Sequence, residues 1–531
     1  MRWIVWGFLL VSCSLWAQEQ ALPKYATEAE KAMGPPIALR KTTPPPSGPI
    51  QTPAEYDPVE GILLSYQGSS SWKSILDQMA AQITTLGNAD VYVMADSASE
   101  ATTILTNMTN AGAVASRVKP LVAATDSIWI RDYGPRYVYE GNCRSIIDHT
   151  YNRPRPNDDA QPFFFGNYKH HTVYEIPLVH GGGNYHLHTD GEAHATRLIN
   201  NENPDLTEQE IHDLWLNYQN VDTHFYTPFP TSIDSTQHID MWMIALADHT
   251  SLISDWPNNA GSTQDQICDS TAQSLINAGY AVTRIPAFSV GGTHYTYTNA
   301  VICNDLVLVP SYTNSTVAPH NSEALTIWQN AMPGKTIVQI NCQAIVTAAG
   351  VMHCIAMHVP VHLGGQNPTA YLQTRFEGQT LQGGNTANLR WISDDDMEVM
   401  HVDLAYSVDN GPFTEIANSL PALGNHTWNI PQLNSNNVRL RVTAWDAAGL
   451  SGIDTTAPFS VAGTVCRGDA APLNGGDGIV DQDDLLVAIG FWLSSEESVD
   501  VWPATGPNTW GDGAVDIRDL VQILDLFGSC P

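Results

Sequence analysis

Four side chains with the chemistry to attack a cationic carbon lie in three separate stretches of the chain. TQHIDMWMIALADHTSLISDW contains His238 and Asp240, SIWIRDYGPR contains Asp132, and GVMHCIAMHVP contains Cys354. A thiol can act as the nucleophile, an imidazole can carry protons, and two carboxylates can hold a positive charge. We therefore expect these groups to form one site.

The spacing of His238 and Asp240 suggests how they are placed. If this stretch is a strand, residues two apart share a face, so His238, Asp240 and Trp242 line one side and the apolar residues between them pack behind. A proton carrier and a carboxylate would then lie side by side.

Each residue also has a simpler interpretation. A single cysteine among apolar residues, such as Cys354, is more often a buried small hydrophobe. A His-x-Asp pair can be a structural hydrogen bond or half of a metal site, and Arg131 and Asp132 could form an internal ion pair. Two glycine-rich loops, at 180–193 and 289–300, favour a site instead, because glycine lets the backbone approach a ligand closely.

Two other catalytic classes compete with this interpretation. The stretches HGGGNYHLH and MHCIAMHVPVH are rich in histidine, but the chain has neither a His-x-x-x-His helix carrying glutamate nor a Cys-x-x-Cys pair, which disfavours zinc. A Cys-His hydrolase of protease type would leave the two acids unexplained.

Length and charge bound the remaining choices. With 531 residues the chain should contain several domains. Its 23 basic and 55 acidic residues, net −32, argue against nucleic acid and anionic membrane surfaces as partners. The acidity would attract cationic substrates, although it mostly serves solubility.

The N-terminus is predicted to be an export signal. Residues 1–17 have Arg2, then an apolar run and a small residue at Ala17, and no later run approaches transmembrane length. We expect a secreted or cell-surface protein that starts at Gln18, with lipid anchoring through Cys13 as the alternative.

The cysteine count suggests that at least one thiol stays free. Eight cysteines are present, and an odd number remains if the leader is removed after Ala17. Cys466 and Cys530 bracket the last segment and are the best candidates for a disulfide. The sequence leaves the pairing of the others open: Cys143, Cys268, Cys303 and Cys342.

Several segments follow the leader. Residues 18–52 are polar and proline-rich and predict a flexible or extended lead-in without a role in chemistry. Residues 53–362 repeat an amphipathic helix, a glycine and a short strand, which predicts a repeated α/β unit with a central site in its loops. Thr207 and Glu210 form a capping box at the start of one such helix.

The remaining residues predict two further domains. Residues 366–463 alternate apolar and polar positions between turn signals, which is typical of an immunoglobulin-like or fibronectin-like β-sandwich with a structural or docking role. Residues 464–531 contain GGDGIVDQDDL and WGDGAVDIRDL, two acidic loops that each lead into a helix.

The two acidic loops match the back half of a calcium loop, in which oxygen ligands surround a hard cation. An acidic surface hairpin is the alternative. The duplicated motif resembles a dockerin-type module, which implies attachment to a docking partner. The candidate ligands are Asp477, Asp481, Asp484, Asp512, Asp516 and Asp519.

The motifs of residues 53–362, taken in order, resemble the guanidino-modifying enzymes. PAEYDPVEGILLSY, SIWIRDYGPR, the Gly-Gly-Asn loop, QHIDMW, THYTYTNA and the late Cys354 look like those of agmatine deiminases and bacterial peptidylarginine deiminases. The resemblance implies the pentein fold, an α/β-propeller with pseudo-fivefold repeats. The β-sandwich that follows and the run YNRPRPNDD favour the peptidylarginine branch.

The resemblance also implies roles for single residues. Cys354 matches the nucleophile, His238 the general acid and base, and Asp132 and Asp240 the carboxylates that bind the guanidinium. Asn299 matches a further residue of the catalytic site. The substrate-binding matches are Trp129, which lines the substrate stem, and Arg153 and Arg155, which bind the carboxylate of a C-terminal arginine.

The resulting hypothesis is a secreted deiminase that converts arginine, at the C-terminus of peptides or proteins, to citrulline and ammonia through a covalent cysteine intermediate. No cofactor is expected for catalysis, and calcium would be structural. Agmatine or free arginine is the alternative substrate, and a non-catalytic binding module on a pentein-like scaffold is the alternative of another class. For Arg153 and Arg155 the alternative is a solvated basic turn.

Overall fold

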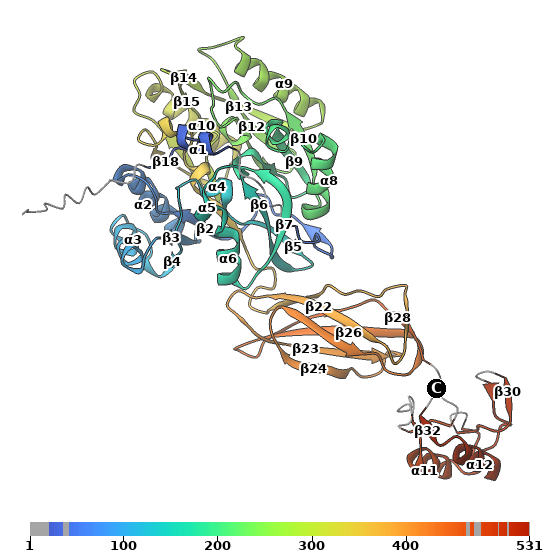
Figure 1. Ribbon diagram of the computed structural model, residues 1–531. Coiled ribbons are helices and arrows are strands. Elements are labelled where there is room, and N and C mark those ends of the chain that lie inside the picture. The colour runs from blue at the N-terminus through green and yellow to red at the C-terminus, as the bar shows by residue number, and fades with distance from the viewer. Residues whose placement is uncertain are drawn as a thin grey trace, which may run out of the picture.

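The protein forms three successive bodies in a computed structural model, which describes residues 21–34, 42–463, 468–471, 479–496, 499–506 and 509–529 (Figure 1). An α/β domain is followed by a β-sandwich and then by a small C-terminal module. The predicted leader with Cys13, the Cys466–Cys530 pair and Asp477 lie outside these residues and stay predictions. No helix within the described ranges is both long and apolar enough to cross a membrane.

Five small sheets of the α/β domain repeat one plan, in which an antiparallel strand pair is extended by a parallel strand. The orders are β5-β6-β7, β8-β9-β10, β11-β12-β13, β16-β17-β18 and β19-β2-β3. In the fifth sheet β19, the last strand of the domain, pairs with β2 from near its start, so the series of sheets closes on itself. This confirms the repeated α/β unit expected from the sequence. The strands are β1 (Ile50–Gln51), β2 (Val59–Ser65), β3 (Asp90–Ala95), β4 (Val118–Val122), β5 (Arg136–Glu140), β6 (Cys143–Tyr151), β7 (Thr172–His180), β8 (His186–Leu187), β9 (Glu192–Thr196), β10 (Asp222–Tyr226), β11 (Met243–Ala247), β12 (Thr250–Asp255), β13 (Ala281–Pro286), β14 (Phe288–Val290), β15 (Thr293–Tyr295), β16 (Val301–Cys303), β17 (Leu306–Ser311), β18 (Thr336–Asn341) and β19 (Met357–Pro360).

The helices between these strands follow the amphipathic pattern of the sequence. In α2 the side chains of Ile75, Met79 and Ile83 are fully buried, because residues three or four apart share one helix face. The capping box of α8 is present, with Thr207 and Glu210 each accepting a backbone N–H of the other residue. The helices are α1 (Glu28–Met33), α2 (Ser70–Thr85), α3 (Ala98–Asn110), α4 (Ile130–Tyr133), α5 (Pro156–Asp159), α6 (Gln161–Lys169), α7 (Leu198–Glu202), α8 (Glu208–Gln219), α9 (Thr263–Asn277) and α10 (Asn321–Ala331).

The segment that carries His238 and Asp240 is not the predicted strand. Ile239–Met241 form a single 3-10 turn with His238 before it, and β11 begins only at Met243. Gln237 has a φ of 61°, in the left-handed region, which an extended strand does not contain. The prediction that His238, Asp240 and Trp242 share a strand face is therefore wrong.

The β-sandwich consists of two sheets with a common apolar core. Its first sheet has the order β20-β22-β25, and its second has the order β21-β28-β26-β23-β24 with β27 paired to β26. Trp391 and Trp428 from one sheet and Leu440 and Phe459 from the other are buried between them. The strands are β20 (Thr369–Leu372), β21 (Thr380–Gln382), β22 (Thr386–Asp394), β23 (Val399–Val408), β24 (Thr414–Leu420), β25 (Gly424–Asn429), β26 (Asn434–Asp446), β27 (Ser451–Thr455) and β28 (Phe459–Ala462). The predicted β-sandwich is confirmed.

Buried charges join the sandwich to the α/β domain. The guanidinium of Arg144, in β6, forms two hydrogen bonds of 2.9 and 3.0 Å with the carboxylate of Asp394, in β22. His171 and His362 contact the same carboxylate. Because a buried charge that loses its partner is costly, this cluster holds the two domains in one arrangement.

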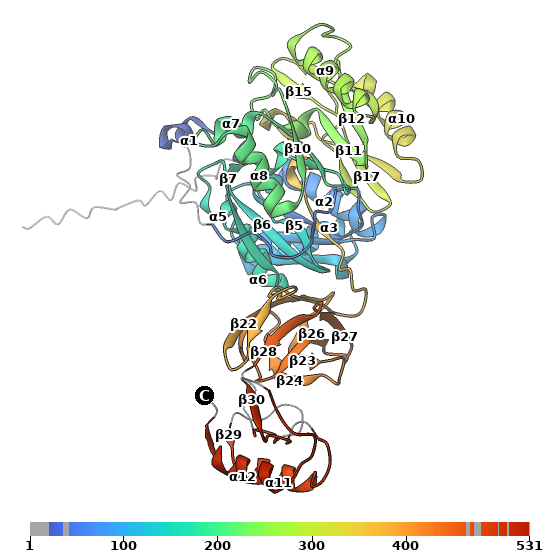
Figure 2. The same cartoon turned by 90° about the vertical axis from the view of Figure 1, so that its right-hand side faces the viewer.

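The C-terminal module contains two helices with the same start, and Figure 2 shows them beside each other at the end of the molecule. Asp481 and Asp484 form a capping box at α11, and Asp516 and Asp519 form another at α12. The elements are β29 (Ile479–Val480), α11 (Gln482–Gly490), β30 (Ala504–Gly506), β31 (Thr509–Trp510), α12 (Ile517–Asp525) and β32 (Gly528–Ser529).

Candidate active site

Cys354 lies at the centre of a fully buried polar cluster. The residue is part of a 3-10 turn, His353–Ile355, just before β19. Its Sγ lies 3.3 Å from Oδ2 of Asp240 and accepts a hydrogen bond of 3.1 Å from Nδ2 of Asn299. Burial, and then the negative charge of Asp240, raises the pKa of the Cys354 thiol above its ordinary value.

His238, Asp132 and Asp240 meet around one glycine. A Cβ on Gly183 would lie 2.8 Å from His238 Nδ1 and 2.9 Å from both Asp132 Oδ1 and Asp240 Oδ2. No side chain fits there, so the glycine-rich loop allows the three groups to converge. The structure brings these residues and Cys354 together, although they come from different turns.

The imidazole ring of His238 faces Asp132. His238 is fully buried, its Nδ1 lies 3.4 Å from Asp132 Oδ1, and neither ring nitrogen has a hydrogen-bond partner among the described residues. One oxygen of each acid, Oδ2 of Asp132 and Oδ1 of Asp240, also lacks a hydrogen bond within the described part of the chain. These atoms are therefore available to a bound molecule.

A chain of buried groups that the sequence analysis did not identify supports Asp240. His353 Nδ1 lies 2.9 Å from Asp240 Oδ2, and its Nε2 lies 2.7 Å from Glu55, which pairs with Arg131 at 2.7 Å. The internal Arg131–Asp132 pair considered as an alternative is thus wrong, since Arg131 is paired with Glu55. Glu55 and His353 occur in the motifs PAEYDP and MHCIAM, but no spacing rule predicts a contact between residues 298 positions apart.

Glu55 and His353 also belong to a candidate metal-binding group with His186, whose donor atoms lie within 4.8 Å of one another. Both ring nitrogens of His353 already face carboxylates. The arrangement is therefore that of a hydrogen-bonded network that orients Asp240.

Asn299 contacts both Cys354 and the turn that carries it. Its amide nitrogen donates to the sulfur of Cys354, and its carbonyl oxygen accepts the backbone N–H of His353 at 3.1 Å and of Val351 at 3.3 Å. One side chain thus fixes both the thiol and the turn that carries it. Asn299 thus lies beside Cys354, where the sequence analysis placed it.

Lys24, from the predicted lead-in, fills the space between these groups. Its Nζ lies 2.9 Å from Cys354 Sγ, 3.5 Å from Asp240 Oδ2 and 3.7 Å from Asp132 Oδ1. Burial disfavours the charge, but the two carboxylates outweigh it and raise the pKa of Lys24 above its ordinary value. In the same way burial would raise the pKa of Asp132, but the charges of Lys24 and His238 lower it to about 2.

The lead-in was predicted to be flexible or extended without a role in chemistry, which is wrong for residues 21–33. They dock on the α/β domain and include the helix α1, which Figure 2 shows at the edge of that domain. Proline content suggested an extended chain, but composition does not report long-range ion pairs.

The predicted substrate-binding residues contact this same segment. Trp129 is buried and its Nε1 donates to the carbonyl of Leu22 at 2.8 Å. Arg153 donates to the carbonyl of Lys24 at 3.2 Å, and the buried Arg155 pairs with the carboxylate of Glu30 at 2.7 Å. The alternative of a solvated basic turn is therefore wrong for Arg155.

The acids of the C-terminal module are used differently. Asp484 accepts backbone N–H groups of Ala470 and Ala471, and Asp519 accepts those of Val501 and Trp502. Among the described residues of the module, the structure assembles no group of three metal-ligating side chains. Calcium binding there stays a prediction.

Asp500 was not among the candidate ligands, yet it belongs to the second acidic loop. Its carboxylate accepts the backbone N–H groups of Asp512, at 3.0 Å, and of Gly513. Arg518 pairs with Asp512 and Asp516 at 2.6 Å. A cation would therefore have to replace Arg518 at the carboxylates of this loop.

Comparisons with known proteins were made for the whole chain. The family model described as Porphyromonas-type peptidyl-arginine deiminase matches residues 51–360. A curated protein of Photobacterium profundum, named "Putative agmatine deiminase", is 21% identical over 373 residues, which cover 60% of this chain and 98% of that protein.

Solved structures of two agmatine deiminases are similar in fold. The enzyme of C. jejuni with substrate bound has a TM-score of 0.52 and 17% identity, and the alignment covers 59% of this chain and 97% of that one. The enzyme of Enterococcus faecalis has a TM-score of 0.52 and 18% identity, covering 59% and 96%. The α/β domain thus has the fold of these deiminases.

Proposed function

This chain belongs to the Porphyromonas-type peptidyl-arginine deiminase family, and we propose that it hydrolyses the guanidino group of arginine in peptides or proteins to citrulline and ammonia. The observation that carries the proposal is the cation of Lys24 held by Asp132, Asp240 and Cys354 in a fully buried site. A guanidinium offers the same charge and adds a carbon that the sulfur can attack.

The carboxylates compensate the cation and orient it. A guanidinium stays protonated at any usable pH, so a buried site must provide negative charge. Oδ2 of Asp132 and Oδ1 of Asp240 lack partners among the described residues, and they supply acceptors for the N–H groups of a planar guanidinium.

The reaction then proceeds in two halves. The thiol of Cys354 passes its proton to His238 as its sulfur bonds to the guanidinium carbon. A C–N bond then breaks, and His238 gives that proton to the departing ammonia. Water adds to the resulting thiouronium carbon as His238 takes its proton, and the C–S bond breaks to release the ureido product. Neither half requires a metal or an organic cofactor.

The positive charge of the substrate favours ionisation of the Cys354 thiol. Burial and Asp240 raise the pKa of the Cys354 thiol, whereas the neighbouring ammonium of Lys24 lowers it. Asn299, which donates to the sulfur, and the incoming cation both favour the thiolate. We infer that attack is coupled to substrate binding.

A citrulline assay tests the chemistry. The purified chain is expected to form citrulline and ammonia from an arginine peptide, and Cys354→Ala is expected to form neither. Cys342→Ala is the matched control, since Cys342 is also buried and free but lies outside the site. Equal product from the wild type and Cys354→Ala would reject the mechanism.

We further propose that the arginine lies at the C-terminus of a peptide or protein. Arg155 holds a carboxylate with its planar fork, and Arg153 donates to the main-chain carbonyl of the residue in the site. The α-carboxylate of a terminal arginine would meet both groups, whereas agmatine has none.

Three substrates separate these possibilities. A peptide that ends in arginine, its C-terminal amide and agmatine are compared on the wild type and on Arg153→Ala/Arg155→Ala. We expect the free acid to be preferred by the wild type and the preference to vanish in the double variant. A faster rate on agmatine would overturn the substrate assignment and leave deimination standing.

The tail and the leader support a second, separate proposal. We propose that the protein is exported and that the C-terminal module attaches it to a partner with the help of calcium, because residues 1–17 resemble a leader and the acidic loops resemble calcium loops. Calcium-dependent binding of the module to cell-surface material, lost on chelation, would support this proposal.

A further inference from the structure

We propose that residues 21–33 are a built-in pseudosubstrate: Lys24 occupies the guanidinium site in place of arginine and must leave before a substrate peptide binds. The inference rests on the proposed function, because it assumes that the site holds an arginine side chain. It assigns the site both a ligand and a form of regulation.

The side chain of Lys24 has the position and charge of a substrate but cannot react. It contacts the nucleophile and both guanidinium-binding acids. Its ammonium nitrogen carries hydrogens and one methylene, so it offers no electrophilic carbon to the sulfur. The segment therefore binds without being converted.

The backbone of the segment is held on both sides of Lys24. Trp129 donates to the carbonyl of Leu22 at 2.8 Å, Arg155 to that of Pro23 at 2.8 Å and Arg153 to that of Lys24 at 3.2 Å. In addition, the backbone N–H of Lys24 donates to the carbonyl of Ala348 at 3.0 Å. These hydrogen bonds involve main-chain atoms of the segment, so a peptide of another sequence can form them too.

The segment also carries a negative charge, Glu30, which pairs with Arg155. The Glu30 carboxylate, on α1, binds the fork of Arg155 at 2.7 and 3.3 Å. Glu30 also closes the capping box of α1 with Thr27, which fixes its side chain. The segment thus offers a cation to the acids and an anion to Arg155, the two charges that a terminal arginine combines.

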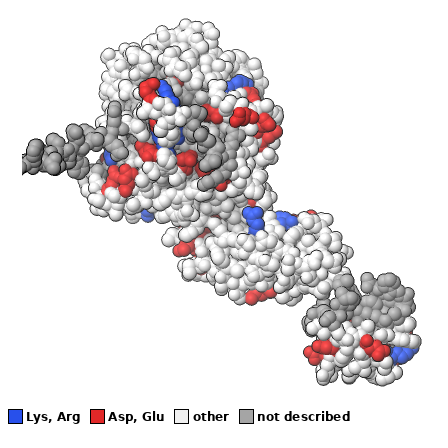
Figure 3. Space-filling model, viewed as in Figure 1, with Lys and Arg blue, Asp and Glu red and all other residues white. Residues whose placement is uncertain are grey.

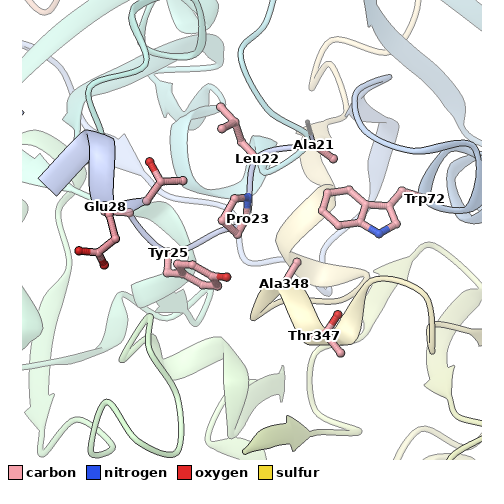
Figure 4. Close-up of a pocket in the computed structure, with 10 residues that line it drawn as sticks. Ala21, Leu22, Pro23, Tyr25, Glu28, Trp72, Thr347 and Ala348 are labelled. Carbon is pink, nitrogen blue, oxygen red and sulfur yellow. The ribbon is translucent and has the colours of Figure 1, made fainter. Parts of the chain in front are cut away.

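Pockets remain beside the segment. One of about 570 Å³ lies between the chain around Pro23 and the opposite wall of Trp72, Thr347 and Ala348 (Figure 4). Another, of about 130 Å³, lies on the other side of Tyr25 against Thr231 and Gly292. The segment leaves space beside Leu22 and Pro23, so a longer side chain on the residues that precede a substrate arginine would be accommodated.

Tethering makes the inhibition strong. Residues 21–33 belong to the same chain as the site, so their docking is intramolecular, with an effective concentration on the order of millimolar. A substrate present at lower concentration competes poorly until the segment dissociates. Removal of a leader after Ala17 would keep Lys24 in the chain, so export alone would not activate the enzyme.

Lys24→Ala tests the inhibition directly. If the segment is docked in more than nine tenths of the molecules, the KM for an arginine peptide should fall at least about tenfold while kcat changes less than about twofold. Lys31→Ala is the matched control, because Lys31 is exposed on α1 and its side chain pairs with Glu28 alone among the residues that the structure describes. Glu30→Gln weakens the contact with Arg155 but leaves Lys24 paired with Asp132 and Asp240, so it should lower KM less than Lys24→Ala does. It is the alternative test if Lys24→Ala fails to fold.

Lys24→Arg tests whether the side chain of residue 24 occupies the guanidinium site. The introduced guanidinium should be converted in the same molecule, at a rate independent of protein concentration: C–S bond formation releases ammonia, and water then releases the ureido group from the sulfur. The new neutral side chain no longer pairs with Asp132 and Asp240, so activity on added peptide should rise with time. Mass spectrometry of the N-terminal peptide, with Lys24→Arg/Cys354→Ala as the control, measures the conversion.

The outcomes separate this inference from the proposed function. Conversion of position 24 and a lower KM in Lys24→Ala support both. If the wild type converts added peptide but KM is unchanged in Lys24→Ala and position 24 stays unconverted, the pseudosubstrate is rejected and deimination stands. If neither the added peptide nor position 24 is converted by any variant, the proposed function itself fails.

Discussion

Two pairs of buried aspartates in this chain are used in opposite ways. In the α/β domain, Asp132 and Asp240 each leave one oxygen without a partner among the described residues and face a cation. In the C-terminal module, Asp484 and Asp519 accept backbone N–H groups from two directions and close helix capping boxes.

This difference shows how burial can serve either a fold or a reaction. Carboxylates that accept backbone N–H groups are satisfied by the protein itself, so they stabilise a particular chain geometry. Carboxylates with a free oxygen in a buried site are costly unless a cation is present, so they favour binding one. Figure 3 shows further acidic side chains on the surface, which have no such constraint.

Replacing one acid of the catalytic pair should have the largest effect. Asp132→Asn and Asp240→Asn each remove a charge that a guanidinium requires and turn an acceptor into a donor, so turnover should fall by at least about a thousandfold. Initial rates of citrulline formation measure it. Retained activity with unchanged KM would mean that the acid is merely structural.

Asn299→Ala should have an intermediate effect. It removes the donor to Cys354 Sγ and the acceptor for the turn around His353, so kcat should fall about ten- to a hundredfold. The thermal midpoint must be recorded alongside. A loss of folding with normal kcat in the remaining folded fraction would contradict the positioning role.

Acid should weaken the docked state through Asp132. Its pKa is lowered from 3.8 to about 2, so its contribution is present above pH 4 and is lost as pH falls toward 2, which amounts to about 2 kcal/mol. In Lys24→Ala one of the two charges that lower the pKa of Asp132 is gone, and this part of the acid dependence should shrink. Unfolding in denaturant from pH 5 to pH 2 measures the difference, and identical profiles for Lys24→Ala and Lys31→Ala would contradict it.

The pair in the module should have the smallest effect on turnover. Asp519→Ala removes the acceptor of three backbone N–H groups and should destabilise the module by about 1–3 kcal/mol. Citrulline formation should stay within about twofold of the wild type, and a chelator should leave it unchanged as well. A large loss of kcat in folded Asp519→Ala would show that the module contributes to the active site.

The sequence predicts the parts of this structure that follow local rules. Helical spacing placed Ile75, Met79 and Ile83 inside, and turn signals predicted the sandwich, since side-chain periodicity is a local property. Leu86 continues this helical spacing but lies just beyond the end of α2 at Thr85, and it is 43% exposed.

The site was predictable only through its motifs. Cys354, His238 and the two acids were chosen for their chemistry and lie together, but the 3-10 turn at Ile239–Met241 was mistaken for a strand. His353 and Glu55 were missed because hydrogen bonds between distant segments leave no periodic trace. Lys24 was missed for the same reason, in a segment whose composition indicated an extended chain.

The central claim, that Cys354 attacks a guanidinium held by Asp132 and Asp240, is tested most directly by trapping the intermediate. His238→Asn should slow hydrolysis of the thiouronium, so acid quenching during turnover of an arginine peptide should leave a protein whose mass has grown by the peptide less ammonia. Fragmentation should place the adduct on Cys354, and His238→Asn/Cys354→Ala should carry none. Citrulline formation by the wild type with no adduct on Cys354, and with equal activity in Cys354→Ala, would contradict the account.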